Sequence, residues 1–130
     1  MTVYNLSEII KQLKITCKIT PIENYICKNG QCYKCTFRRN NKTFTTYFFQ
    51  SIDNSQEVNI CNIIASIITN CESLEYCKDF VDWCYNFGYK TIDVNAFEAF
   101  RECAVLRKKF VNFLGEDNYR KLLQYKLAMQ

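Results

Sequence analysis

The chain has 130 residues, of which 48% are hydrophobic and 23% charged, a composition that excludes a disordered tail and suits one domain over residues 1–130. Its formal net charge of +4 conceals uneven blocks, with eight basic and two acidic residues in 1–50 but two basic and eight acidic residues in 51–98. The longest mainly apolar stretch, residues 60–68, is far shorter than the ~20 residues that cross a bilayer, so we expect no membrane association.

The N-terminal segment predicts a short helix followed by a strand. Ser7 can cap a helix that runs to Leu13, since its hydroxyl can accept a hydrogen bond from the first turn. Residues 14–20 alternate polar and apolar side chains, the pattern of a half-buried strand, and Pro21 ends this strand or places it at a sheet edge.

Two further strands are predicted at residues 31–38 and 42–50, joined through residues 39–41. The dipeptide Asn29-Gly30 is the strongest short hairpin signal in the chain, because both residues tolerate the positive φ that tight hairpin turns require. The sequence therefore indicates a small antiparallel sheet of two to three strands.

The second half of the chain predicts helices. Ser55 can cap a first helix over residues 56–70, and a second helix should present Val81 inward and end near Gly88. Asp93 can cap a longer helix that ends at Leu114, and one or two further turns follow Gly115. With the short N-terminal helix, the sum is an α+β fold: a small antiparallel sheet followed by a bundle of three to four helices.

Two motifs stand in this helical half. One is Phe80-Val81-Asp82-Trp83 followed after four residues by Gly88-Tyr89, written "FxxWxxxxGY", and the other is residues 113–117, "FLGED". With the hairpin over residues 33–44, this order resembles a family of small bacteriophage and prophage proteins. The resemblance implies the same hairpin-then-helices fold and a phage origin, and it carries no catalytic or binding role onto any named position.

Four acidic residues have the spacing of one helix face. They are separated by three, four and three positions, which on a single helix forms one stripe: Glu72, Glu75, Asp79 and Asp82. The stripe is open to two interpretations, a solvated helix face or an acidic surface that occupies a basic groove on another protein. Trp83 lies off the predicted inward face, so we expect it half-exposed beside the stripe as an interface anchor.

Basic residues gather in the hairpin: Lys34, Arg38, Arg39 and Lys42. Charged side chains on a sheet can simply prevent unwanted strand pairing. Alternatively, because aromatic residues such as Phe37 and Tyr47 are interleaved with them, the hairpin can contact nucleic acid.

The chain contains nine cysteines and no histidine. An odd cysteine count argues against a fully paired disulfide scaffold, and most of these thiols should act as small apolar side chains. Four of them could form a tetrahedral zinc site: Cys17, Cys27, Cys32 and Cys35. No second CxxC supports this site, and side chains three residues apart on a strand point to opposite faces. We therefore predict no metal and no other cofactor.

Without histidine, the usual general base near neutral pH is missing, and three glycines are too few for a phosphate-binding loop. We therefore predict that the protein is not an enzyme. The favoured function is a phage-encoded, stoichiometric inhibitor of a host or defence protein, of which an anti-CRISPR protein is the most concrete form. The alternative is a nucleic-acid-binding module. The N-terminus has no signal-peptide pattern, so we expect a cytoplasmic location in the bacterial host; the sequence leaves the oligomeric state open.

Overall fold

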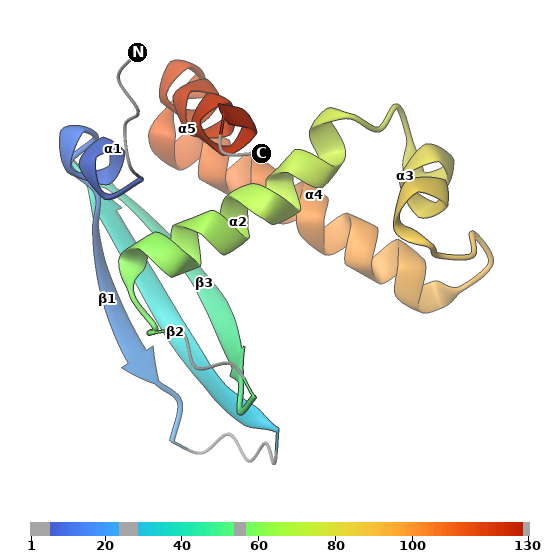
Figure 1. Cartoon of the computed structure of the whole chain (residues 1–130), viewed down its shortest axis with the longest axis horizontal. Helices are drawn as coiled ribbons and strands as arrows, with labels where there is room; N and C mark the ends of the chain where they lie inside the picture. Colours follow the sequence, from blue (N-terminus) through green and yellow to red (C-terminus); the bar gives the residue numbers. More distant parts are fainter. Residues whose placement is uncertain (1–5, 24–28, 54–56, 129–130) are drawn as a thin grey trace.

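The computed structural model describes residues 6–23, 29–53 and 57–128. These residues form three strands and five helices, which in chain order are α1 (Leu6–Gln12), β1 (Thr16–Pro21), β2 (Gly30–Arg39), β3 (Lys42–Ser51), α2 (Ile60–Glu75), α3 (Phe80–Phe87), α4 (Val94–Leu114) and α5 (Glu116–Ala128). The predicted α+β class is confirmed. Figure 1 shows the sheet at one end of the molecule and α3 at the other, with α4 extending between them.

The sheet is antiparallel with the order β1-β2-β3. Its side chains alternate between two faces, and the inner face carries the buried residues Cys35, Phe37 and Phe44. The β2–β3 hairpin closes through a two-residue loop, in which Asn40 has a φ of 55°. Asparagine tolerates this left-handed conformation, which mirror-image hairpin turns require at their first position.

The prediction of a tight hairpin turn at Asn29-Gly30 was wrong. Gly30 is instead the first residue of β2, opposite Ser51. A Cβ atom at this position would lie 2.0 Å from the backbone oxygen of Gln50, so only glycine allows this approach of the two strands.

Helix α2 begins at Ile60, after an N-cap in which the side chain of Asn59 accepts a hydrogen bond from the backbone N–H of Asn62. The helix was predicted at residues 56–70, and the proposed cap Ser55 lies outside the described residues. One side of α2 is fully buried, through Ile63, Ile64, Ile67, Ile68 and Cys71.

The main core lies between the sheet and the helices. The inner face of the sheet packs with α1, α2, α5 and the C-terminal half of α4, whose Phe110 and Phe113 rings contact Phe44 at 5.7 and 5.8 Å between centroids. Helix α5 is longer than the predicted one or two turns, and it contributes the buried residues Tyr119, Leu122 and Leu123.

One buried thiol makes the main core sensitive to alkaline pH. Burial raises the pKa of Cys71 to about 12, from an ordinary value of 9.0. The unfolded chain loses this proton near pH 9 while the folded chain keeps it, so the stabilisation is fully present below pH 9 and is lost as the pH rises toward 12. We expect the contribution of Cys71 to the slope of unfolding free energy against pH to approach about 1.4 kcal/mol per pH unit.

This pH dependence can be measured by urea unfolding between pH 8 and 10.5 in the presence of a reductant. The Cys71→Ala variant, although less stable at every pH because of the cavity it leaves, should lose stability less steeply. Equal slopes for the two proteins would contradict the assignment to Cys71.

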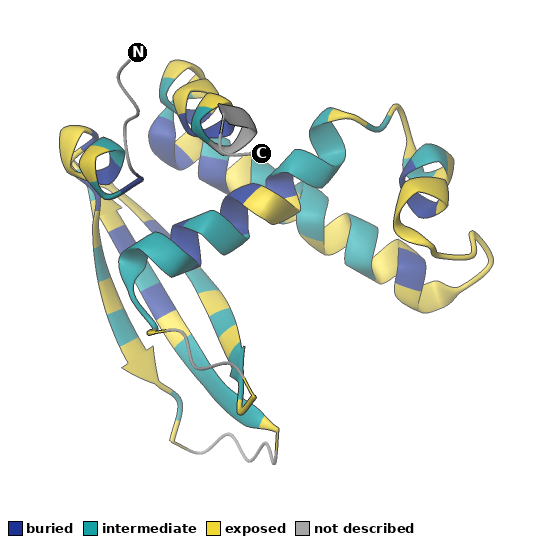
Figure 2. Cartoon of the chain, viewed as in Figure 1, coloured by how far each residue is buried: buried dark blue, intermediate teal, exposed yellow. Residues whose placement is uncertain are grey.

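A second, smaller core lies at the other end of the molecule. There α3 packs on the N-terminal half of α4 around the buried residues Trp83, Cys84 and Ala96. Figure 2 shows buried positions of α3 and of the first turns of α4 facing each other, with exposed positions around them. We call residues 76–103 the arm.

The arm has well-defined helix ends. Asp79 and Asp93 cap α3 and α4, and Gly88 ends α3 in the left-handed conformation with a φ of 75°. The predicted roles of Asp93, Gly88 and Gly115 as helix boundaries are confirmed. Across the described part of the chain, no helix has the length and apolar character needed to span a membrane.

Candidate functional site

The four carboxylates of the predicted acidic stripe do not lie on one helix. Helix α2 ends at Glu75 and α3 begins at Phe80, with the chain changing direction between them. The prediction of a single continuous helix face was therefore wrong. Its physical cause is the Asp79 cap: its side chain accepts a hydrogen bond from the Asp82 backbone N–H at 2.9 Å and starts a new helix.

Glu75 is part of the internal structure of the fold. Its carboxylate oxygen accepts hydrogen bonds from Arg107 Nε at 2.5 Å and from the buried Tyr119 hydroxyl at 2.9 Å. The Arg107 guanidinium also lies 5.5 Å from the centroid of the Tyr119 ring. The hydrogen bond with Glu75 raises the pKa of Arg107, and burial raises the pKa of the Tyr119 phenol. A substitution of Glu75 would therefore disturb the contact of α2 with α4 and α5.

The other three carboxylates of the stripe also have partners within the chain. Glu72 is half-buried and takes part in interactions of its own. Asp82 accepts hydrogen bonds from the Lys78 backbone N–H at 3.1 Å and from the Asn86 side chain at 3.3 Å. Asp79 and Asp82 thus satisfy the first turn of α3, where negative charge is favoured by the helix dipole. Partner binding by these residues stays a prediction.

Trp83 is buried, which corrects the prediction of a half-exposed anchor. Its side chain is 4% exposed, its indole N–H donates to Ser73 Oγ at 3.1 Å, and its ring stacks on Tyr89 at 5.1 Å. Val81, predicted to face inward, is exposed instead. The inward orientation predicted for Val81 was wrong because α3 is a new helix whose inner face is set by contact with α4. The spacing of Phe80, Trp83 and Phe87 marks that face.

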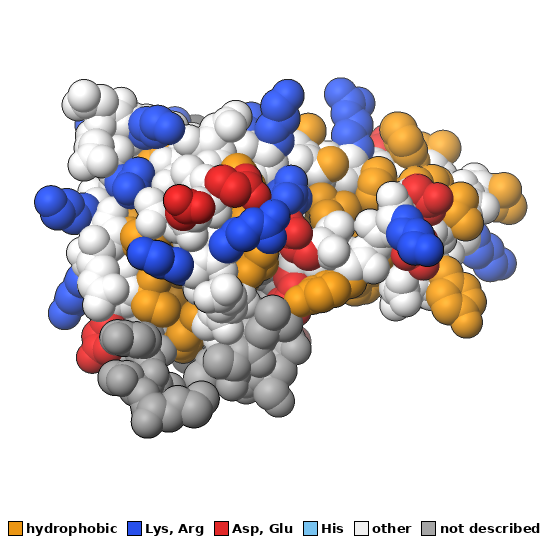
Figure 3. Space-filling view, turned by 90° about the horizontal axis from the view of Figure 1, so that it is seen from above, with side chains coloured by type: hydrophobic (Ala, Val, Ile, Leu, Met, Phe, Trp, Pro, Cys, Tyr) orange, Lys and Arg blue, Asp and Glu red, His pale blue; other side chains and the backbone are white. Residues whose placement is uncertain are grey.

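The outside of the arm is unusually apolar. Among the described residues, twelve large hydrophobic side chains are exposed, and eight of them belong to the arm: Tyr76, Val81, Tyr85, Phe87, Tyr89, Ile92, Val94 and Phe97. Two of these side chains make almost no contact with the rest of the chain, since Tyr85 is 86% and Ile92 90% exposed. Figure 3 shows hydrophobic side chains gathered at this end of the molecule.

Charged side chains are interspersed with the apolar ones on the arm. Lys78, Lys90 and Arg101 supply positive charge, and Asp93 and Glu98 supply negative charge, all of them exposed. Exposed aromatic side chains together with charges of both signs are common in protein–protein interfaces. This surface could not be recognised from the sequence, because aromatic residues at helical spacing are usually core residues.

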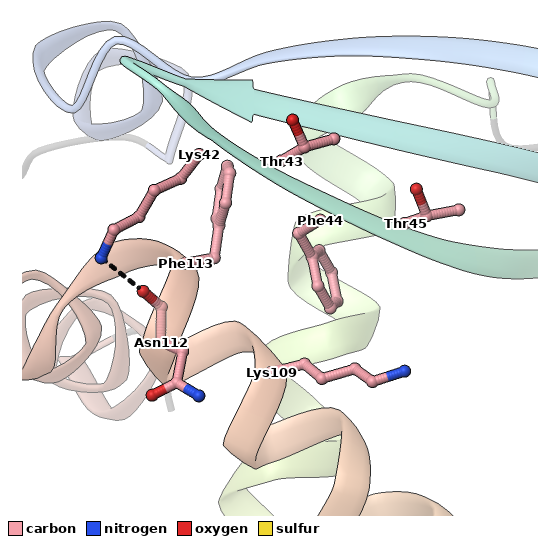
Figure 4. Close-up of a pocket in the computed structure, with 7 residues that line it drawn as sticks. All are labelled: Lys42, Thr43, Phe44, Thr45, Lys109, Asn112 and Phe113. Carbon is pink, nitrogen blue, oxygen red and sulfur yellow. Dashed lines mark hydrogen bonds between the residues drawn. The ribbon is translucent and has the colours of Figure 1, made fainter.

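The predicted basic hairpin is divided by the structure. Arg39 Nε donates to the Leu13 carbonyl oxygen at 3.1 Å, and Lys42 Nζ donates to the Asn112 carbonyl oxygen at 2.9 Å. Figure 4 shows the Lys42 side chain extending from the start of β3 to α4. Two of the four cations thus hold the hairpin against α1 and α4, while Lys34 and Arg38 are exposed on the outer face of the sheet.

The cysteines considered for zinc do not assemble where the structure describes them. Cys27 lies outside the described residues, and Cys32 and Cys35 have opposite orientations on β2. Cys17 and Cys35 lie together on the inner face, where their mutual hydrogen bond and then burial raise the pKa of Cys17. In the ranges 6–23, 29–53 and 57–128, no group of three or more potential ligands could hold a metal ion.

Comparison of the chain with protein-family models, with curated proteins and with solved structures finds no match. The resemblance to small phage proteins therefore stays a prediction. The candidate site stands on its own geometry: a capped, two-helix arm whose outer surface carries most of the exposed apolar side chains in the described chain.

Proposed function

We propose that this protein is a non-catalytic binding factor that occupies a surface of another protein with its arm. The observation that carries the proposal is the concentration of exposed apolar side chains on residues 76–97, of which Tyr85 and Ile92 are the most exposed. Concentrations of this kind on soluble proteins mark interaction sites, whereas single exposed apolar residues are ordinary.

The energetics favour a protein partner. Burying a large apolar side chain at an interface contributes about 1.5–3 kcal/mol to the free energy of binding, and aromatic residues dominate the binding energy of many interfaces. The arm also holds the backbone that carries these side chains in place before binding, because Trp83 packs against Phe87 and Phe100 and both helices of the arm are capped. A rigid surface loses less conformational entropy on association than a flexible one.

The resemblance to phage proteins supports a host or defence protein as the partner, with binding in the bacterial cytoplasm. An inhibitor of this type acts stoichiometrically, by covering a surface that the partner needs, and requires no catalytic residues. An anti-CRISPR protein is the most concrete example of such a role.

The double variant Tyr85→Ala/Ile92→Ser tests the proposal. Both side chains are almost fully exposed, so thermal stability should change little while affinity for the partner falls at least about tenfold. The measurement is capture from nuclease-treated bacterial lysate by the tagged protein, followed by titration of the purified partner.

The matched control is Ile52→Ser/Val105→Ser, which removes two exposed apolar side chains outside the arm. It should bind the partner as the unmodified chain does. Equal binding of the partner by both double variants would contradict the proposal. So would a failure of the tagged protein to capture any protein from nuclease-treated lysate. A homodimer that only the arm variant dissociates would replace the foreign partner with a second copy of the chain.

A further inference from the structure

The outer face of the sheet is a second surface, formed by residues of the three strands. The three strands contain five basic residues, Lys18, Lys34, Arg38, Arg39 and Lys42, and no Asp or Glu. Because side chains alternate along a strand, Lys18, Lys34 and Arg38 share the face opposite to the main core, and all three are exposed. This face is therefore positively charged with no acidic side chain among its strand residues.

The strand register brings the three cations together. Lys18 of β1 pairs with Thr36 of β2, and Thr36 stands between Lys34 and Arg38 along its strand. Adjacent strands lie about 4.8 Å apart, and alternate residues of one strand about 6.6 Å apart. The Cα atoms of Lys34 and Arg38 are therefore about 13 Å apart, and that of Lys18 lies diagonally about 8 Å from each of them.

Two exposed aromatic rings continue this face onto β3. Tyr47 pairs directly with Lys34, and Phe49 pairs with Cys32 one row further along. Tyr47 is 62% and Phe49 46% exposed, in contrast to the buried Phe44 on the inner face of the same strand. The Phe49 ring lies against Gly30, where an added Cβ atom would be 2.7 Å from its Cζ atom, and about half of the residue stays exposed, while Tyr47 is the more exposed of the two.

The helices leave this face open. Helices α2, α4 and α5 lie on the inner side of the sheet with the main core. Figure 4 shows Thr43 and Thr45 of β3 pointing away from α4, while Phe44 between them points toward Lys109. The outer face thus presents hydroxyl groups, cations and aromatic rings in one layer.

We propose that the outer face of the sheet binds single-stranded nucleic acid. Lys18, Lys34 and Arg38 contact the phosphates over β1 and β2, and unpaired bases stack on Tyr47 and Phe49 over β3. Positive charge beside exposed rings matches the chemistry of a single strand, which offers a charged backbone and unstacked bases side by side. A duplex keeps its bases stacked inside and offers the rings nothing to bind.

The distribution of cations and rings over the strands sets the orientation of the bound strand. The groove beside β3 that Tyr47 lines holds Glu98 and Glu102 together with Arg101 and Lys109 of α4, so acidic and basic side chains balance there. The cations of the outer face lie on β1 and β2 and its exposed rings on β3, so the backbone lies on the β1–β2 side and the bases point toward β3. The basic residue set differs from the predicted hairpin set, because Lys18 takes the place of Arg39 and Lys42.

The test is fluorescence anisotropy of a labelled 15-nucleotide oligothymidylate with the full chain, at 50 and 200 mM salt. Release of counterions from three phosphate contacts predicts about 20-fold weaker binding at the higher salt. The variant Lys18→Ala/Lys34→Ala/Arg38→Ala should reduce affinity at 50 mM salt at least about tenfold, and Tyr47→Ala/Phe49→Ala about tenfold for each ring lost.

Three comparisons decide the outcome. The control Lys11→Ala/Lys108→Ala/Lys121→Ala removes the same charge from exposed helix positions and should bind like the unmodified chain. A 15-base-pair duplex and polyglutamate of similar charge should bind at least tenfold more weakly than the single strand. Equal loss in the control, equal binding of duplex or polyglutamate, or no binding of the single strand at 50 mM salt would each overturn the proposal. The Tyr85→Ala/Ile92→Ser variant should bind the oligonucleotide normally.

Discussion

Replacing Phe110 with alanine is expected to lower the free energy of unfolding by about 3–5 kcal/mol. Phe110 is fully buried at the centre of the main core, where its ring lies 5.7 Å from that of Phe44 and 6.2 Å, edge-on, from that of Tyr119. Removing it leaves a cavity between β3, α4 and α5 that these packed aromatic neighbours can fill only partly. Urea unfolding followed by far-ultraviolet circular dichroism measures the effect.

Phe97→Ala is the matched control for this prediction. It makes the same substitution on the same helix, at a half-exposed position of the arm. Because that ring is already largely in water, the expected loss is well below that of Phe110→Ala. Similar losses for the two variants would mean that the main core is not organised around Phe110.

The Trp83→Ala variant should destabilise the arm by about 3–5 kcal/mol while affecting the sheet much less. Trp83 is the largest buried side chain of the arm, and three aromatic rings, those of Phe87, Tyr89 and Phe100, lie within 5.5 Å of it. The substitution also leaves the Ser73 hydroxyl without its indole donor. Because the arm has its own core, the loss should be local.

Amide hydrogen exchange resolves this local effect. In Trp83→Ala, amides of α3 should exchange faster while those of β2 keep their protection. Val81→Ala, an exposed position on the same helix, serves as the control and should leave both regions unchanged. Equal acceleration in α3 and β2 would show that the two cores unfold as one unit.

Much of the fold could be predicted because local signals and tertiary contacts agree. The alternation over residues 42–50 and the caps at Asp93 and Gly115 all correspond to elements of the structure. These signals depend on backbone chemistry within a few residues, so they do not require knowledge of the packing partner.

The acidic stripe and the orientation of Trp83 could not be predicted in the same way. The break between α2 and α3 contains neither Gly nor Pro, and Asp79 was counted as a surface charge although it caps α3. An error of that kind shifts the helix face assigned to residues after the break, which is why Val81 was expected inside and Trp83 half-exposed, whereas the structure buries Trp83 and exposes Val81.

The candidate surfaces were harder still to predict, because apolar residues resemble core residues until their neighbours are known. Tyr85 and Trp83 have similar character in the sequence, yet one is in solvent and the other is buried. The four basic residues of the hairpin were predicted as one set. The structure divides them, because Arg39 and Lys42 make long-range hydrogen bonds within the fold while the other two face outward.

Helix α4 belongs to both cores: Ala96 is buried in the arm and Phe110 beside the sheet. A helix of 21 residues is about 30 Å long, at 1.5 Å per residue. It therefore fixes the position of α3 relative to the far strands of the sheet, while its middle part lines a groove with Tyr47 of β3. If both proposed surfaces bind, this one helix sets the separation and the relative orientation of the two bound molecules.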